Sequence, residues 1–184
     1  MSRVCVFLAD GFEEIEGLTV VDILRRAGVD TQMVSITEER MVTGSHGIPV
    51  QADICLKDAD FSATELLALP GGMPGTLHLG ECRMLTELLA EFSESGKKVA
   101  AICAAPSVLG DLGILKGKKA ACYPGFEKRL SGAEVVYDKV AEDGNVTTSR
   151  GMGTAIPFAL SLVRQMVSEE KAQEIKSSII YGHE

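Results

Sequence analysis

A cysteine lies at the junction between a predicted buried strand and a predicted helix, in the segment Ala101-Ile102-Cys103-Ala104-Ala105-Pro106. Small residues stand two positions before and two positions after Cys103, which is the spacing of a nucleophile elbow. The proline suits a first helical turn, where its missing N–H is not needed. We expect the free N–H groups and the positive dipole end of this helix to lower the pKa of the thiol. A buried structural cysteine is the alternative, since free cysteine is among the most buried residue types.

Two glycines follow another predicted strand, in Leu69-Pro70-Gly71-Gly72. Glycine lets the backbone approach a ligand closely and leaves N–H groups free to point at it. The N–H groups of Gly72 and Ala104, the residue after the cysteine, therefore predict a two-donor oxyanion hole. On the sequence alone, a turn that requires positive φ is the simpler explanation of the glycines.

The first predicted helix opens with three glutamates, at positions 13, 14 and 16. Carboxylates in a first turn complement the helix dipole, which accounts for Glu13 and Glu14. Glu16 instead heads a stripe that is otherwise apolar, made of Val20, Ile23 and Ala27. A carboxylate that faces the core is costly unless it is paired or protonated. When protonated it is a candidate general acid or base with a raised pKa, so the structural and functional explanations of Glu16 both stay open.

Other kinds of site find no support. The histidines at positions 46, 78 and 183 lack ligand spacing, so we predict no metal site. The first βα turn, at residues 10–14, lacks G-x-G-x-x-G and is acidic where a pyrophosphate would lie, and no glycine-rich loop is followed by G-K-[ST]. We therefore expect no cofactor.

The elements that must position these residues alternate along the chain. Hydrophobic runs and turn signals predict strands at 4–9, 31–36, 65–69, 98–102 and 119–122, and a pair at 135–137 and 146–148 flanking a turn at 143–145. Helices are predicted at 13–27, 84–92, 106–112, 154–167 and 169–177, short strands or a hairpin within 41–54, and a helical turn at 125–130. This alternation predicts an α/β three-layer sandwich with a mostly parallel sheet and helices on both faces. We expect residues 1–184 to form a single domain, with ligands binding beyond the carboxyl ends of the strands.

Composition limits the partners. Lys and Arg number 18 against 26 Asp and Glu, a net charge of −8 that repels phosphate backbones and anionic lipid. Aromatic residues make up 5% of the chain and tryptophan is absent, which leaves little for stacking on nucleic-acid bases. The longest uncharged apolar run, 99–105, is too short to span a membrane, and no signal peptide is expected. Nucleic-acid and membrane partners are therefore not expected.

The cysteines indicate a reducing, cytoplasmic location. There are five, an odd number, with no C-x-x-C pair, so neither a disulfide framework nor a zinc ribbon fits. Cys5, Cys55 and Cys122 fall in strand-like runs and are expected to be structural. Cys82 heads a helix and is a candidate second reactive thiol.

Taken together, these segments resemble the DJ-one/PfpI (ThiJ/PfpI) superfamily over nearly the whole chain, close to its Parkinsonism-associated protein deglycase branch and its bacterial relatives. The resemblance lies in residues 13–16, 21–28, 69–72, 100–106 and 148–154. It implies a flavodoxin-like fold and a homodimer. It also implies that Cys103 is an oxidation-sensitive nucleophile, that Glu16 is its protonated hydrogen-bond partner, and that Gly72 and Ala104 are the backbone donors. We expect Gly71, Tyr123 and Arg150 to line the same pocket.

The chain departs from the pattern of this superfamily near the cysteine. Many members carry a histidine just before a proline, where this chain has Tyr123, and tyrosine is a poor base at neutral pH. A mechanism that needs that histidine is therefore in doubt. The peptidase-like branch has a histidine directly after the cysteine, where this chain has Ala104, so proteolysis is not expected. Class I glutamine amidotransferases need a downstream His–Glu pair, and the only candidate is the terminal His183-Glu184.

Three functions stay open. The preferred one is a cofactor-free enzyme of the glyoxalase III or deglycase type, which acts on reactive dicarbonyls such as methylglyoxal, or on glycated substrates, in carbonyl and oxidative stress defence. The second is a redox sensor or redox-regulated chaperone whose Cys103 oxidises to a sulfinate with little or no turnover. The third is a small-molecule binding protein that keeps the pocket without the chemistry.

Overall fold

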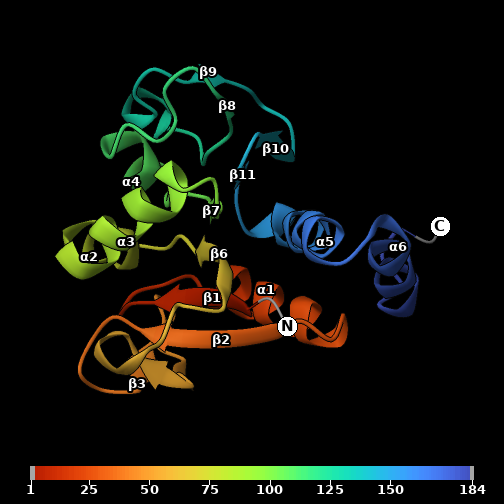
Figure 1. The fold of residues 1–184 in the computed structure, drawn as a ribbon, viewed down its shortest axis with the longest axis horizontal. Coiled ribbons are helices and arrows are strands. Elements are labelled where there is room, and N and C mark those ends of the chain that lie inside the picture. Colours follow the sequence, from red (N-terminus) through yellow and green to blue (C-terminus); the bar gives the residue numbers. More distant parts are fainter. Residues whose placement is uncertain (1–2, 183–184) are drawn as a thin grey trace.

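The computed structural model describes residues 3–182 and places a seven-stranded sheet at the centre of the molecule (Figure 1). The strand order is β10-β11-β7-β6-β1-β2-β5, and every neighbouring pair is parallel except β10 with β11. The strands are β1 (Arg3–Leu8), β2 (Asp30–Ser35), β5 (Ile54–Cys55), β6 (Thr64–Leu69), β7 (Lys98–Ile102), β10 (Val140–Asp143) and β11 (Val146–Ser149). The inner order β2-β1-β6-β7-β11 is that of a flavodoxin-like sheet, whose switch point lies between β1 and β6.

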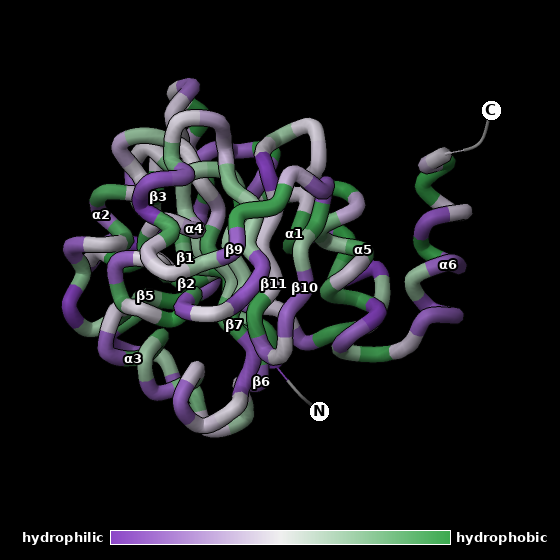
Figure 2. The backbone as a smooth tube through the Cα atoms, turned by 90° about the horizontal axis from the view of Figure 1, so that it is seen from above, coloured by the Kyte–Doolittle hydropathy of each residue, from purple (hydrophilic) through white to green (hydrophobic). Residues whose placement is uncertain are grey.

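Helices cover both faces of the sheet (Figures 1 and 2). One face is covered by α1 (Glu14–Arg26) and α5 (Ala155–Met166), with α6 (Glu169–Ser178) packed on the outer side of α5. The other face is covered by α2 (Gly75–Glu81), α3 (Arg83–Glu94) and α4 (Pro106–Asp111). The predicted three-layer α/β sandwich with a mostly parallel sheet is confirmed.

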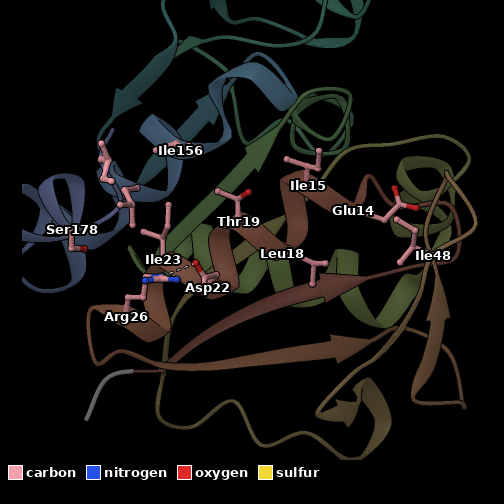
Figure 3. Close-up of a pocket in the computed structure, with 12 residues that line it drawn as sticks. Glu14, Ile15, Leu18, Thr19, Asp22, Ile23, Arg26, Ile48, Ile156 and Ser178 are labelled. Atoms are coloured by element: carbon pink, nitrogen blue, oxygen red, sulfur yellow. Dashed lines mark hydrogen bonds and ion pairs between the residues drawn. The ribbon is translucent and has the colours of Figure 1, made fainter. Parts of the chain in front are cut away.

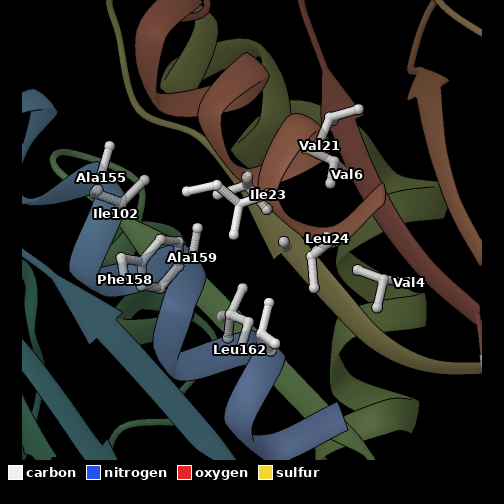
Figure 4. Close-up of a cluster of buried hydrophobic side chains, with 14 of the residues drawn as sticks. Val4, Val6, Val21, Ile23, Leu24, Ile102, Ala155, Phe158, Ala159 and Leu162 are labelled. Carbon is white, nitrogen blue, oxygen red and sulfur yellow. The ribbon is translucent and has the colours of Figure 1, made fainter. Parts of the chain in front are cut away.

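The core consists of two layers that share the central strands. In β1, Val4, Val6 and Leu8 pack against α1 and α5, whereas Cys5 and Phe7 pack on the opposite side. Figure 4 shows the first layer, in which strand residues meet α1 and α5 side chains. Because β1 and β7 are buried on both faces, they are continuous apolar runs rather than alternating ones. Each fully buried large aliphatic or aromatic side chain contributes roughly 1.5–3 kcal/mol.

A hairpin projects beside the start of α1, where short strands were predicted within 41–54. It pairs β3 (Met41–Thr43) with β4 (Pro49–Gln51) in antiparallel register. The helical turn predicted at 125–130 is the 3₁₀ helix η2 (Glu127–Arg129). Two further 3₁₀ turns are η1 (Leu56–Asp58) and η3 (Met152–Thr154).

Three predictions are wrong in detail. The strand before the 143–145 turn is β10, not 135–137; its acidic residues hid it in the sequence, and an edge strand tolerates such charges. The segment predicted at 119–122 is a strand only at β8 (Lys119–Ala120), which pairs with β9 (Glu134–Val135) in a separate two-stranded sheet. The helix α2 was not predicted, because its two glycines lower helix propensity.

Among residues 3–182, no helix has both the length and the apolar character that crossing a bilayer requires.

Candidate active site

Three chain segments meet at the switch point of the sheet: the first turn of α1, the loop after β6 and the corner after β7. The N–H of Gly71 donates to Oε2 of Glu16 at 2.8 Å. A Cβ on Gly71 would lie 2.6 Å from Cβ of Cys103 and 2.8 Å from Oε2 of Glu16. Only glycine at position 71 therefore lets the cysteine and the glutamate lie this close together.

The backbone at Cys103 is a strained corner. Its φ is +67°, in the left-handed region that non-glycine residues rarely adopt. The corner is held from two sides, because the N–H of Cys103 donates to the carbonyl of Ser149 at 3.0 Å and the N–H of Tyr123 donates to the carbonyl of Cys103 at 2.7 Å. Strain of this kind persists only where the surroundings enforce it, and it is concentrated at functional sites. Helix α4 begins at Pro106, so the predicted strand-to-helix junction is present.

Two backbone N–H groups act on the sulfur of Cys103. They belong to Gly72 and Ala104, and both favour the thiolate. Gly72 has φ +91°, and a Cβ there would lie 2.3 Å from the backbone nitrogen of Glu13. The structure thus brings together the four positions that the sequence singled out for the chemistry, namely residues 16, 72, 103 and 104.

The pKa of Cys103 is the point at which the sequence-based expectation is wrong. Burial raises the pKa of this thiol to about 12, together with the negative charge of Glu16 and a hydrogen bond from the thiol to that carboxylate. The N–H groups of Ala104 and Gly72 lower the pKa, as expected for a helix start, but do not outweigh the other influences. Cys103 therefore keeps its proton at neutral pH, and a base must take that proton as the sulfur reacts.

Glu16 is placed to take that proton. Its side chain is 1% exposed, and burial raises its pKa to about 7 against the hydrogen bonds from Cys103 and Gly71, which lower it. Within residues 3–182, its Oε1 atom has no hydrogen-bond partner. Near neutral pH this carboxyl group can both hold and release a proton, and one of its oxygens is free to act on a ligand.

The rim of the site is formed by the segment after β11 and by Tyr123. A Cβ on Gly151 would lie 3.3 Å from Cδ2 of Tyr123 and 4.0 Å from the free Oε1 of Glu16. Tyr123 is 50% exposed, so the rim at this residue is open to solvent. Arg150 is partly buried, with its guanidinium carbon 5.5 Å from the ring centroid of Tyr137.

Two residues beside the site were missed by sequence reasoning. Glu14 was expected to be an ordinary first-turn carboxylate, yet it is 4% exposed and accepts hydrogen bonds from the backbone N–H and Nδ1 of His46, at 2.8 and 2.9 Å. Burial opposes its ionisation, but the hydrogen bonds from His46 and from the backbone N–H groups of Glu14 and Ile48 together lower its pKa to about 2. No local pattern reveals this pair, because its members are 32 residues apart on different elements.

Among the described residues, one group could bind a metal ion. It consists of Glu13, Glu14 and His46, and their ligand atoms lie within 4.8 Å of one another. Both Glu14 oxygens already accept hydrogen bonds from His46, and Oε2 of Glu13 caps α1 through the N–H of Glu16 at 2.7 Å. These contacts join the helix to the hairpin, and we assign the cluster a structural role. Cys5, Cys55 and Cys122 are buried as predicted, while Cys82 is half-buried at the start of α3.

Comparison with known proteins gives consistent matches. The DJ-1/PfpI family model matches residues 2–165. Protein DJ-1 homolog B of Arabidopsis thaliana is 38% identical over 180 residues, which is 97% of this chain and 41% of that protein. The chain covers 46% of homolog A of the same plant, so it spans less than half the length of either relative.

Two further matches cover most of this chain and most of the matched protein. A Caenorhabditis elegans protein named glutathione-independent glyoxalase DJR-1.2 is 34% identical over 164 residues, 89% of this chain and 87% of that protein. The structure of oxidized Toxoplasma gondii DJ-1 superposes with a TM-score of 0.95 at 34% identity and covers 100% of both chains. With this fold, these motifs and these matches, the chain belongs to the DJ-1/PfpI family.

Proposed function

We propose that this protein is a cysteine-dependent enzyme that converts reactive 2-oxoaldehydes such as methylglyoxal into 2-hydroxy acids without an added cofactor. The observation that carries the proposal is the convergence of a thiol and a carboxyl group of pKa about 7 with two backbone donors at one sheet edge. The name of the C. elegans relative, a glutathione-independent glyoxalase, supports the same reaction here.

The first step joins the thiol to the aldehyde. Glu16 takes the proton of Cys103 as the sulfur attacks C1, so the S–C1 bond forms while the C1=O double bond opens to an oxyanion. The N–H groups of Gly72 and Ala104 are the donors that stabilise this charge. The proton then passes from Glu16 to the oxyanion, which gives a neutral hemithioacetal.

The second step moves hydrogen between the two carbons. Glu16 removes the proton from C1 and returns a proton to C2, while the hydroxyl proton on the C1 oxygen passes to the C2 oxygen through an enediol. C1 thereby becomes a thioester carbonyl and C2 a secondary alcohol. Water then hydrolyses the thioester, which releases lactate and restores the thiol, so methylglyoxal plus water balances lactate. The free Oε1 of Glu16 suits this role, and no step needs a histidine at position 123. A glycated amine in equilibrium with free methylglyoxal would be repaired by the same reaction.

The decisive experiment is lactate formation from methylglyoxal, without glutathione or added metal, at substoichiometric protein. We expect many turnovers for the wild type and for the matched control Cys82→Ser. Cys103→Ser should abolish turnover, and Glu16→Gln should lower it at least ~10²-fold, the usual contribution of a general acid–base group. No more than one equivalent of lactate from the wild type would refute the enzyme.

Redox sensing is the second candidate function. It would take place in a reducing cytoplasm, where the cysteines stay in the thiol form until an oxidant such as peroxide is present. The two N–H donors and the Glu16 carboxyl around the sulfur would also hold the oxygens of a sulfinate, and the Toxoplasma relative is described as oxidized. Peptide mass spectrometry after mild peroxide tests this function and any chaperone role that depends on it. Selective addition of two oxygens at Cys103 supports sensing, whereas equal oxidation of Cys103 and Cys82 contradicts it.

We also propose that the protein is a homodimer through the outer face of α1. A groove of about 690 Å³ runs along this face, and its lining includes Ile15, Leu18 and Ile48 (Figure 3). Ile180, which follows α6, also lines it. The same groove carries the exposed ion pair of Asp22 with Arg26. In a two-fold symmetric dimer, this surface packs against the same surface of the second copy. Asp22 and Arg26 of one copy can then lie opposite Arg26 and Asp22 of the other, while the isoleucines are buried.

A further inference from the structure

Arg150 differs from the other arginines of the chain. Each of the others donates a side-chain hydrogen bond to an acceptor on the protein. Within residues 3–182, Arg150 donates none, and its Nε is buried without a partner. Its guanidinium lies 5.5 Å from the centroid of the Tyr137 ring, a cation–π contact that leaves the N–H donors without a hydrogen bond. A guanidinium has five donors and stays charged in proteins, so a partly buried one without an acceptor is costly unless a ligand supplies the anion.

The sheet register places the backbone of Arg150 beside the cysteine. Ser149 pairs with Ile102 in the parallel register of β11 and β7, so Arg150 follows β11 abreast of Cys103, which follows β7. Neighbouring strands lie about 4.8 Å apart. The next residue, Gly151, borders Tyr123 and the free Oε1 of Glu16. Arg150 therefore belongs to the segment that borders Cys103 and Glu16, where a ligand on the sulfur would lie.

The charge of Arg150 is also felt on the Tyr123 side of the site. Burial raises the pKa of Cys122 to about 11, and the positive charge of Arg150 acts in the opposite direction. The guanidinium is thus close to Cys122. The N–H of the following residue, Tyr123, donates to the carbonyl of Cys103.

We propose that Arg150 determines the specificity of this site by binding the carboxylate of small carbonyl compounds as they add to Cys103. The favoured ligands are then short aldehydes that carry an acid group, of which glyoxylate is the simplest probe. In the addition the S–C bond forms, the carbonyl oxygen takes the thiol proton by way of Glu16, and the carboxylate stays on the guanidinium unchanged. This inference rests on the proposed function for turnover, and it names the substrate class that the site selects. Since the chain has a net charge of −8, an anion needs such a local cation to enter.

Alkylation kinetics test the proposal without requiring turnover. Iodoacetate and iodoacetamide both transfer a two-carbon unit to a thiolate with loss of iodide, and they differ in ending in a carboxylate or a neutral amide. Mass spectrometry gives the two rates at Cys103, and at Cys82 as an internal reference. The proteins compared are the wild type, Arg150→Met, Arg150→Gln and Arg150→Lys. The matched control is Arg129→Met, which removes an arginine that is paired with Asp111.

In Arg150→Met and Arg150→Gln, we expect the iodoacetate to iodoacetamide rate ratio at Cys103 to fall about tenfold, as for loss of a charge-assisted hydrogen bond. The ratio in Arg150→Lys should lie between those of the wild type and the neutral variants, because lysine keeps the charge without the planar guanidinium. The ratio at Cys82 in every protein, and that at Cys103 in Arg129→Met, should match the wild type. Glyoxylate should also protect Cys103 from iodoacetamide better in the wild type than in Arg150→Met.

An unchanged ratio at Cys103 in both neutral variants, with wild-type rates at Cys82 to show that the fold is intact, would overturn the proposal. A fallen ratio in a protein that does not turn over methylglyoxal would uphold anion recognition and reject only the enzyme. Turnover of methylglyoxal together with an unchanged ratio would uphold the enzyme and reject anion recognition by Arg150.

Discussion

Glu16 is buried and Cys103 is partly buried. The charge of Glu16 raises the cost of a thiolate at Cys103, whereas the hydrogen bond from the thiol favours the ionised form of Glu16. Burial favours the neutral form of either group, so near neutral pH the pair holds less than one negative charge, and its titration belongs to both residues together. The backbone donors at Gly72 and Ala104 stabilise charge on the sulfur, and the N–H of Gly71 stabilises charge on the carboxylate. Reactivity is thus set by where one proton lies, and a ligand that enters the pocket can shift it.

The buried carboxyl group makes stability depend on pH. The pKa of Glu16 is about 7 in the folded protein against an ordinary value of 4.5, so the folded state binds this proton more tightly. The associated stability is present below pH 4.5 and is lost as pH rises through 7. Relative to Glu16→Gln, we expect the wild type to lose about 2 kcal/mol of unfolding free energy between pH 5 and pH 8. Urea denaturation of both proteins at the two pH values measures this, and parallel changes would contradict it.

At the scale of elements, the sequence predicted the site better than its surroundings. Parallel strands end at one edge, so a cysteine after 98–102 and glycines after 65–69 had to lie near the helix that carries Glu16. The contact of Glu14 with His46 could not be predicted, because the hairpin docks on α1 through side chains far apart in the chain. The pKa direction at Cys103 was also out of reach, since it depends on burial and on the distance to Glu16 rather than on the helix start alone.

The loop after β6 is predicted to tolerate no side chain at Gly72. Its φ of +91° and the 2.3 Å approach of a Cβ to the backbone nitrogen of Glu13 combine strain with a clash that no side-chain rotation relieves. We expect Gly72→Ala to cost about 2–4 kcal/mol. Gly113→Ala is the matched control, because its φ of +74° is similar but no atom lies within 4 Å of the Cβ, so it should cost about 1 kcal/mol. Equal losses of unfolding free energy in the two variants would show that the clash is absent.

The link between the hairpin and α1 should fail in acid. The pKa of Glu14 is about 2 in the folded protein against an ordinary 4.5, so its ionised form contributes stability above pH 4.5 that is lost as pH falls toward 2. Glu14→Gln removes the charge-assisted hydrogen bonds to His46 and should cost about 1–3 kcal/mol at pH 7. The difference from the wild type should shrink at pH 3. Urea unfolding at both pH values tests this, and a difference that does not depend on pH would assign the loss to packing instead.

At the scale of the whole molecule, helix α1 connects the site with the outer surface. Its inner face carries Glu16 against the sheet, while its outer face carries Ile15 and Leu18 in the groove of Figure 3. Glu14 lines the same groove and is held by the hairpin. A second copy seated on this groove would therefore cover the segment that positions Glu16.

A charge placed in the groove should separate the copies without unfolding either. Ile15 is 50% exposed in the single chain, so Ile15→Glu should change its stability by no more than about 0.5 kcal/mol. In a dimer, the same change buries two unpaired carboxylates at the two-fold contact, which is costly. Sedimentation should therefore give the wild type twice the mass of the chain and Ile15→Glu the mass of one chain. Val167→Glu, at a site 47% exposed and outside the groove, should remain dimeric. A monomeric wild type, or an Ile15→Glu variant that stays dimeric, would place any contact between copies elsewhere.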